Sequence, residues 1–555
     1  MPPGLSAGRD GAFTFESPPA AGHDLAVAGG TGGAWRPGVR GIRALPPPRR
    51  WSVIARVRTA CLWGLEAFPV DCEVDVGPGL PGFVLVGLPD ASVREVRDRV
   101  WPALRNTGLH PPDRKVTVNL APAGRRKEGA SADLAVALGA LAATEQVPLA
   151  RLAHAAAFGE VALDGTVRDV RGTLGLAEAV CRAGARALLC AAGSAPEAAL
   201  VRDLAVHPVE RLEDAVRWLR GEDLPRASPA PADPAEAEAP DLADVRGQVV
   251  ARRALEITAA GAHHLLLVGP PGAGKSMLAE RLPGLLPPLD ERESLDVTRL
   301  HSAAGLRAPG LGLLRRRPFR APHHSLSRAG LIGGGNPPRP GELSLAHHGV
   351  LFLDELAQYP RHLLDALREP LETGAVWLAR AGVSVRWPAR ALVIAAMNPC
   401  PCGWLGHPRR GCRCTPAQHS AFAARVSGPV LDRLDLQIEV PALTGEELDR
   451  TLPGETSAAV RSRLLAARER QRARGVLNSA LPPARLREEC ALGAAARKLT
   501  RDAVDRGGFS ARGIARALRV ARTIADLAGE AAVSETALAE ALQYRAYEAR
   551  RSGAA

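Results

Sequence analysis

Residues 265–276 read LLLVGPPGAGKS, an apolar run followed at once by a glycine-rich segment. The four apolar residues predict a buried strand, and residues 269–276 match the spacing G-x-x-x-x-G-K-S of a phosphate-binding loop. In such a loop the backbone N–H groups and the positive end of the following helix face the same anion. We therefore predict that a nucleotide is bound by Gly269, Pro270, Pro271, Gly272, Ala273, Gly274, Lys275 and Ser276. Lys275 is expected to reach the β- and γ-phosphates of ATP, and Ser276 to ligate Mg²⁺. The alternative, a chance glycine turn, does not account for an eight-residue match between a strand pattern and a helix pattern.

Two carboxylates end the next strong strand pattern, GVLFLDE at residues 349–355. We predict that Asp354 holds Mg²⁺ through water and that Glu355 polarises the attacking water. An acidic pair after an apolar run is a weak signal alone, but a position about 80 residues after a phosphate loop makes it specific. The alternative is that two acids end a strand where a helix starts.

Three more polar residues are candidates for the same chemistry. Asn398 follows an apolar run at 391–397 and is expected to orient the lytic water, the alternative being a strand cap. Arg433 is a candidate arginine finger that acts across a subunit interface. Arg512 opens a helix pattern and is a candidate for closing on the γ-phosphate from a lid. For either arginine the alternative is a solvated helix face.

Length and composition describe a basic, multidomain, globular chain. Its 555 residues exceed what one hydrophobic core supports, so we expect about three domains. The net charge of +12 favours an anionic partner, and DNA is the foremost candidate. A coding bias would explain the excess of arginine over lysine, but it does not explain the net charge. No apolar run is long enough for a membrane span and no signal peptide is recognised, so we expect a cytoplasmic protein.

Changes in composition divide the chain. Residues 1–52, rich in Gly, Ala, Pro and Arg, predict a disordered tail. Residues 53–220 alternate strand and helix patterns, and residues 221–240 contain five prolines and predict a linker. The nucleotide-binding core is expected at 241–445 and a helical domain at 446–555.

Four cysteines crowd into one short segment. Cys400, Cys402, Cys412 and Cys414 form two C-x-C pairs separated by a turn-rich loop. Four thiolates suit tetrahedral Zn²⁺, and such a site would be structural because it leaves no position for water. The pairs are closer than the usual C-x-x-C, so His407 and His419 remain alternative ligands. The other alternative is a loop of reduced thiols.

Three longer segments resemble a known family. They are GELSLAHHGVLFLDE at 341–355, AMNPCPCG at 396–403 and LRVARTIADL at 518–527. With the phosphate loop they resemble the AAA+ ATPases, and more closely the magnesium-chelatase-like ComM/YifB family, from about Arg56 to Tyr547. The resemblance implies an α/β P-loop AAA+ motor with a helical lid, in a homo-oligomeric ring, a hexamer, that hydrolyses ATP between subunits. It also implies that the ring moves single-stranded or branched DNA, as in branch migration of recombination intermediates during natural transformation.

Residues 376–387, VWLARAGVSVRW, predict a hairpin that turns at 381–382. Its position before the Asn398 strand resembles the pore hairpin of related helicases. Arg380 and Arg386 are therefore candidates for contacts with DNA phosphates, the alternative being ordinary surface charges. A second basic segment, LLRRRPFRAPHH at 313–324, could also face DNA, with His323 and His324 near the nucleotide and without an assigned role.

The domain at 53–220 resembles another family in two places. NLAP at 119–122 with KEGASADL at 127–134, and GEVALDGTV at 159–167, are similar to segments of Lon-type proteases. The resemblance implies an α+β, ribosomal S5 domain 2-like fold in which Ser131 occupies the position of the nucleophile. Leu174 occupies the position of the catalytic lysine and cannot activate a serine, so we do not expect peptidase activity. The alternative role for Ser131 is a helix cap.

Three functions remain open from the sequence. The first is an ATP-driven DNA motor with ATP and Mg²⁺ as cofactors. The second is a magnesium-chelatase-type subunit that uses the same motor to insert Mg²⁺ into a tetrapyrrole. The third is an ATP-dependent protease or protein-remodelling factor. DNA-stimulated ATPase activity, tetrapyrrole-dependent activity and labelling of Ser131 by a serine-reactive probe would distinguish them.

Overall fold

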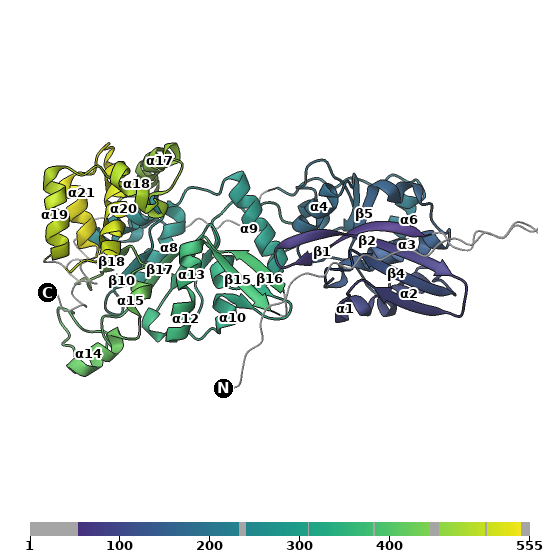
Figure 1. Ribbon diagram of the computed structural model, residues 1–555, viewed down its shortest axis with the longest axis horizontal. Coiled ribbons are helices and arrows are strands. Elements are labelled where there is room, and N and C mark those ends of the chain that lie inside the picture. The colour runs from purple at the N-terminus through teal and green to yellow at the C-terminus, as the bar shows by residue number, and fades with distance from the viewer. Residues whose placement is uncertain are drawn as a thin grey trace, which may run out of the picture. The chain divides into compact units, whose positions relative to one another are not determined.

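The structure is a computed structural model that describes residues 54–231, 240–308, 310–380, 383–444, 454–505 and 508–545 (Figure 1). The predicted tail at 1–52 lies outside the described residues. Residues 221–231 and 240 of the predicted linker are described, and they contain neither helix nor strand.

The N-terminal domain is built on a seven-stranded sheet in the order β3-β4-β2-β1-β5-β8-β9. Its strands are β1 (Ala55–Trp63), β2 (Glu66–Gly77), β3 (Gly82–Val86), β4 (Lys115–Ala121), β5 (Ala155–Phe158), β8 (Ala187–Ala191) and β9 (Ala205–Val209). Its helices are α1 (Ala91–Arg94), α2 (Val96–Asn106), α3 (Asp133–Ala143), α4 (Thr173–Arg182), α5 (Ala195–Ala198) and α6 (Leu212–Leu219). The β1/β2 and β2/β4 pairs are antiparallel, whereas β5, β8 and β9 are joined in parallel.

The alternating pattern of 70–76 explains how this sheet buries one face. Val70, Cys72, Val74 and Val76 of β2 are buried, while the residues between them are partly exposed. The sequence predicts strands at 83–87 and 115–120, and the structure confirms them as β3 and β4. The sequence also predicts a turn at Asp164-Gly165, and this turn joins the short antiparallel pair of β6 (Glu160–Val161) and β7 (Val167–Arg168).

The nucleotide-binding core is a five-stranded parallel sheet in the order β11-β14-β17-β10-β18. Its strands are β10 (Leu265–Val268), β11 (Phe319–Arg320), β14 (Val350–Leu353), β17 (Leu392–Met397) and β18 (Leu436–Glu439). Every residue of β10, β14 and β17 is buried, as expected for parallel strands covered on both faces. The carboxyl ends of parallel strands meet at one edge, which places the residues after β10, β14 and β17 together.

Helices and short strands complete this core. They are α7 (Val249–Gly261), α8 (Lys275–Leu285), α9 (Glu291–Ala304), α10 (Arg328–Leu331), α11 (Glu342–Leu345), α12 (Arg361–Ala366), α13 (Arg368–Thr373), α14 (Pro416–Ala423), α15 (Gly428–Leu431), β12 (Gly333–Gly334) and β13 (Arg339–Pro340). The predicted hairpin is confirmed as β15 (Ala375–Arg380) paired antiparallel with β16 (Val383–Pro388). Its turn residues, 381–382, lie outside the described residues.

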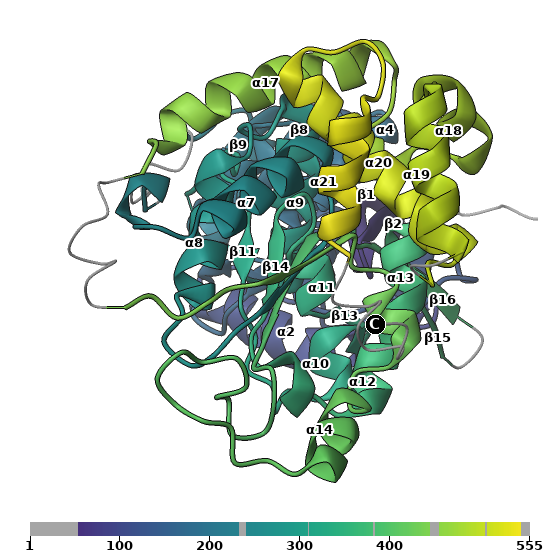
Figure 2. The same cartoon turned by 90° about the vertical axis from the view of Figure 1, so that its left-hand side faces the viewer.

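The C-terminal part is helical, as predicted. Its helices are α17 (Ser457–Ala473), α18 (Pro483–Glu489), α19 (Ala494–Asp505), α20 (Ala511–Ala528) and α21 (Glu535–Gln543), and they lie together in both views (Figures 1 and 2). Val520 and Ile524 of α20 belong to the same apolar core as Leu255 and Ile257 of α7, so the lid packs directly on the nucleotide-binding core. In the described part of the chain, no helix is long and apolar enough to cross a membrane.

Candidate functional site

The phosphate loop connects β10 to α8, as the sequence predicts. Gly272 and Gly274 have φ angles of +78° and +87°, a conformation that only glycine adopts without strain. Gly269 is required for a different reason, because a Cβ there would lie 2.2 Å from the carbonyl oxygen of Val440. Gln248 stabilises the same region, since its Nε2 donates to the Ala273 carbonyl at 3.2 Å and to the Pro441 carbonyl at 2.8 Å. Gln248 precedes the helix at 249 and has no recognisable motif, so sequence analysis missed it.

Lys275 is held inside the loop. Its Nζ donates to the carbonyl oxygens of Gly269 at 2.7 Å and Pro270 at 3.0 Å, and to Oδ1 of Asn398 at 3.3 Å. The side chain is buried, and burial lowers the pKa of its ammonium group while the charges of Asp354 and Glu355 oppose that shift. Lys275 and Asn398, predicted from separate segments, therefore meet at the site.

Ser276 and Asp354 form the second part of the site. The hydroxyl of Ser276, at the start of α8, donates to Oδ2 of Asp354 at 2.9 Å. A hydroxyl and a carboxylate oxygen in contact form a donor set that suits Mg²⁺. The structure thus brings together the two residues that the sequence assigned to the metal.

Glu355 follows in a left-handed conformation, with a φ angle of +51°. Its backbone N–H donates to Oδ1 of Asp354 at 2.8 Å, and its Oε2 lies 3.2 Å from Nδ1 of His324. The carboxylate is exposed and is therefore accessible to water. The contact with His324 joins two positions 31 residues apart, and no spacing rule would have found it.

These segments match family models along most of the chain. Residues 241–448 match the magnesium chelatase subunit ChlI family, residues 72–194 match the family of subunit ChlI of Mg-chelatase, and residues 454–545 match the ChlI C-terminal family. Competence protein ComM of Haemophilus influenzae is 43% identical over 500 residues, which cover 89% of this chain and 97% of ComM. The chain belongs to the ComM/YifB family of magnesium-chelatase-like AAA+ proteins.

Two further relatives support the family assignment. YifB of Escherichia coli is 42% identical over 496 residues, covering 89% of this chain and 97% of YifB. An uncharacterized protein of Mycobacterium tuberculosis is 44% identical over 504 residues, covering 90% of this chain and all of the relative. The family implies ATP and Mg²⁺ as ligands and suggests ATPase activity.

The two candidate arginines lie in different environments. Arg433 is held within its own chain: Nε donates to the Arg368 carbonyl at 2.9 Å, and Nη2 lies 2.5 Å from Oε1 of Glu372. Arg512, the second residue of α20, is exposed. Within the described part of the chain, neither arginine forms a hydrogen bond with the phosphate loop. Their proposed roles therefore depend on a second subunit for Arg433 and on closure of the lid for Arg512.

A buried network that the sequence did not predict connects the lid to the core. Asp435, just before β18, accepts from Nη1 of Arg516 on α20 at 2.7 Å and lies 3.2 Å from Nδ1 of His263. Burial alone would raise the pKa of Asp435, but the His263 hydrogen bond and the charge of Arg516 hold it well below its usual range. His263 also contacts the hydroxyl of Thr523 on α20 at 2.8 Å. Arg516 is thus the ion-pair partner of a buried carboxylate.

The hairpin presents an aromatic and a basic side chain. Trp377 and Arg386 are cross-strand partners, and the Arg386 guanidinium lies 5.9 Å from the Trp377 ring centroid. Trp377 is 57% exposed, which is unusual for so large an apolar side chain. Arg380 ends β15, and its side chain lies outside the described residues.

The four cysteines converge as predicted. The Sγ atom of Cys400 lies 3.4 Å from that of Cys402 and 3.6 Å from that of Cys412, and all four sulfurs lie within 4.8 Å of one another. Zinc–sulfur bonds of about 2.3 Å would place tetrahedral sulfurs about 3.8 Å apart, so this spacing fits a metal and not a disulfide. His419 lies beside the cluster, with its Nε2 3.5 Å from Sγ of Cys412.

His407 is unsuited to join the cysteine cluster. Its Nδ1 accepts the backbone N–H groups of Arg409 and Arg410, each at 3.1 Å. A neutral imidazole that accepts at Nδ1 carries its proton on Nε2, which then has no lone pair for a metal. Of the two histidines predicted as alternative ligands, only His419 remains a candidate.

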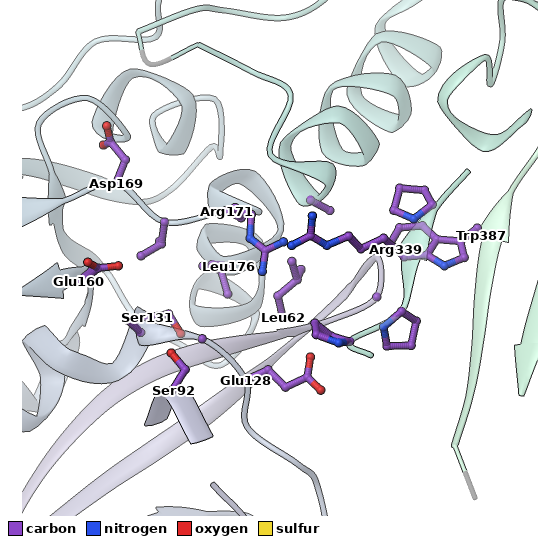
Figure 3. Close-up of a pocket in the computed structure, with 18 residues that line it drawn as sticks. Leu62, Ser92, Glu128, Ser131, Glu160, Asp169, Arg171, Leu176, Arg339 and Trp387 are labelled. Carbon is purple, nitrogen blue, oxygen red and sulfur yellow. The ribbon is translucent and has the colours of Figure 1, made fainter. Parts of the chain in front are cut away.

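Ser131 is one of the residues that line a pocket of about 280 Å³, and it lies at the end away from Trp387 (Figure 3). Its hydroxyl donates to the carbonyl oxygen of Ala60 at 3.1 Å. No side chain caps α3, so the predicted cap role of Ser131 is wrong: a 3₁₀ turn at Ala130–Ala132 places the hydroxyl toward β1 instead. Among the described residues that line the pocket there is no lysine or histidine to accept its proton, and Leu174 is buried.

Proposed function

We propose that this protein is an ATP-driven ring motor that acts on DNA and migrates branches of recombination intermediates during transformation. The observation that carries the proposal is the convergence of Lys275, Ser276, Asp354, Glu355 and Asn398 at the carboxyl edge of one parallel sheet. The name of the Haemophilus influenzae relative, a competence protein, supports the DNA substrate and the pathway.

Each residue of this cluster has a defined task in hydrolysis. The phosphate loop and Lys275 bind the β- and γ-phosphates, and Lys275 leaves its loop carbonyls to do so. Ser276 and Asp354 would hold Mg²⁺, which supplies positive charge to the departing phosphate oxygens. Glu355 accepts a proton from the attacking water, and Asn398 orients that water beside Lys275.

A ring would complete the site. Arg433 lies outside the cluster and is paired with Glu372 in its own chain. We propose that it is released toward the nucleotide of a neighbouring subunit in a homo-oligomer, a hexamer, while Arg512 closes from the lid. Mixing Lys275→Ala and Arg433→Ala subunits tests this directly. Activity is restored in the mixture if Arg433 acts on a neighbour's site, whereas action within one subunit leaves the mixture inactive.

The hairpin is the candidate DNA contact. Arg380 and Arg386 would meet phosphates, and Trp377 offers a flat apolar face on which a base can stack. The net charge of +12 supports the same partner.

For the cysteine cluster we propose Zn²⁺ as the metal, because four convergent thiolates match its preferred ligands. Four protein ligands leave no open position, so the ion would be structural and not catalytic.

Chelatase activity is the second candidate, favoured by the family models. Both candidates are tested by ATP turnover of the wild type with and without forked or four-way DNA, beside Lys275→Ala and Glu355→Gln. We expect DNA to stimulate turnover of the wild type and neither variant to respond. Turnover that ignores every DNA form but rises with a tetrapyrrole and chelatase partner subunits would favour the chelatase.

A further inference from the structure

The four-cysteine loop lies directly against the nucleotide site. Cys400 is fully buried and follows Asn398 by two residues at the carboxyl end of β17. Gly403 packs on the phosphate loop: a Cβ at this position would lie 2.8 Å from Cδ of Pro271 and 3.9 Å from Cγ of Asn398. The loop therefore forms a wall behind both the phosphate loop and the amide that contacts Lys275.

This wall has little support of its own. Among residues 401–411, all of them described, there is no helix or strand, and Gly403 is the only buried residue. One contact within the loop joins the Arg410 guanidinium to the Trp404 ring, whose centroid lies 4.4 Å away. A turn-rich loop without an apolar core needs a cross-link to hold one conformation, and the convergent sulfurs are placed to supply it.

We infer that a thiolate-bound metal at Cys400, Cys402, Cys412 and Cys414 is a positioning element of the nucleotide site, which holds Gly403 against Pro271 and fixes Asn398 beside Lys275. The inference rests on the proposed ATPase function and adds a consequence: metal occupancy sets ATP affinity and turnover. The cluster therefore does more than stabilise its own loop, because loss of the metal would displace the phosphate loop through the contact of Gly403 with Pro271.

The first test compares thiol variants of the full-length protein. Cys412→Ser should lose bound zinc, measured by elemental analysis, and should bind a fluorescent ATP analogue more weakly and turn over ATP more slowly. Cys181→Ser, which removes a partly exposed thiol from α4, is the matched control and should retain zinc and turnover. Reconstitution of stripped wild type with Zn²⁺ alone should restore both nucleotide affinity and turnover.

The second test leaves every cysteine in place. Gly403 and Gly406 both have left-handed φ angles, +81° and +76°, so alanine strains the backbone similarly at either position. Only Gly403 faces the phosphate loop, because a Cβ at Gly406 has nothing within 4 Å. We expect G403A to keep its zinc and to lose about 10²-fold in kcat/KM for ATP, the size of effect that a displacement of about 1 Å produces. We expect G406A to keep both zinc and turnover.

The outcomes separate this inference from the proposed function. Equal kcat/KM values for G403A and G406A, or full nucleotide affinity in zinc-free Cys412→Ser, would overturn the positioning role while leaving the ATPase assignment intact. Absence of ATP turnover in the zinc-loaded wild type would defeat the ATPase assignment. Nucleotide affinity would then still decide the inference, because Pro271 belongs to the binding loop itself.

Discussion

Replacing Asp435 with asparagine should weaken the packing of the lid on the nucleotide-binding core. The Asp435 carboxylate is 4% exposed and contacts Arg516 on α20 as well as His263 beside β10. Asparagine has nearly the same volume, but it removes the negative charge and turns an amide toward groups that donate. Arg516 is then left without its buried counterion.

The size of the effect follows from burial. Removing one partner of a buried ion pair costs about 3–5 kcal/mol, and the Arg516 side chain is 21% exposed, so we expect the lower end, about 3 kcal/mol. The folded state holds the pKa of Asp435 below its usual range, so the carboxylate stabilises the fold at neutral pH. That contribution is lost as the pH falls through the folded-state pKa. The difference in the free energy of unfolding between wild type and D435N should therefore be largest near pH 7 and become smaller in acid.

The assay is thermal unfolding as a function of pH, together with a double-mutant cycle that adds Arg516→Met. Coupling between the two positions should make the double variant less destabilised than the sum of the single variants. Asp432→Asn, three residues earlier and partly exposed, is the control and should change little. A midpoint for D435N that matches the wild type at neutral pH, or purely additive effects in the cycle, would refute the reasoning.

Three more substitutions probe the site and the DNA surface. Glu355→Gln should retain ATP binding and lose about 10²–10⁴-fold in kcat, because it removes the group that accepts the proton of water; weakened nucleotide binding would contradict this. His324→Ala should free the Glu355 carboxylate and raise DNA-independent turnover with unchanged ATP affinity, and a loss of turnover would speak against this pairing. Arg386→Ala should weaken DNA binding and reduce by about one the slope of the logarithm of DNA affinity against the logarithm of salt concentration. Arg361 is an exposed arginine on α12, and Arg361→Ala should change neither quantity.

The residues that sequence analysis found share a physical property. Lys275, Asp354 and Asn398 each follow a fully buried strand, and the carboxyl ends of parallel strands must meet, so separate motifs predict one site. The hairpin and the cysteine cluster could also be predicted from the sequence. Alternation of apolar and polar residues and the spacing of metal ligands are both local patterns.

Contacts between distant segments could not be predicted from the sequence in the same way. His324 meets Glu355, and Asp435 meets Arg516, only after the sheet and the lid have packed. Ser131 shows the opposite error: its position before a helix suggested a cap, but an intervening 3₁₀ turn directs its hydroxyl to Ala60. The local propensity for helix and strand predicts the secondary structure of these segments, whereas tertiary packing determines what each side chain contacts.

The central claim is that ATP hydrolysis at the Lys275–Glu355 site moves DNA branches. It is tested most directly with a four-way DNA junction whose arms carry fluorescent labels, incubated with ATP and Mg²⁺. We predict that the wild type moves the branch point and separates the labelled arms, while Glu355→Gln binds the junction and leaves it intact. A wild type that hydrolyses ATP without moving the junction, or a Glu355→Gln variant that moves it equally well, would contradict the claim.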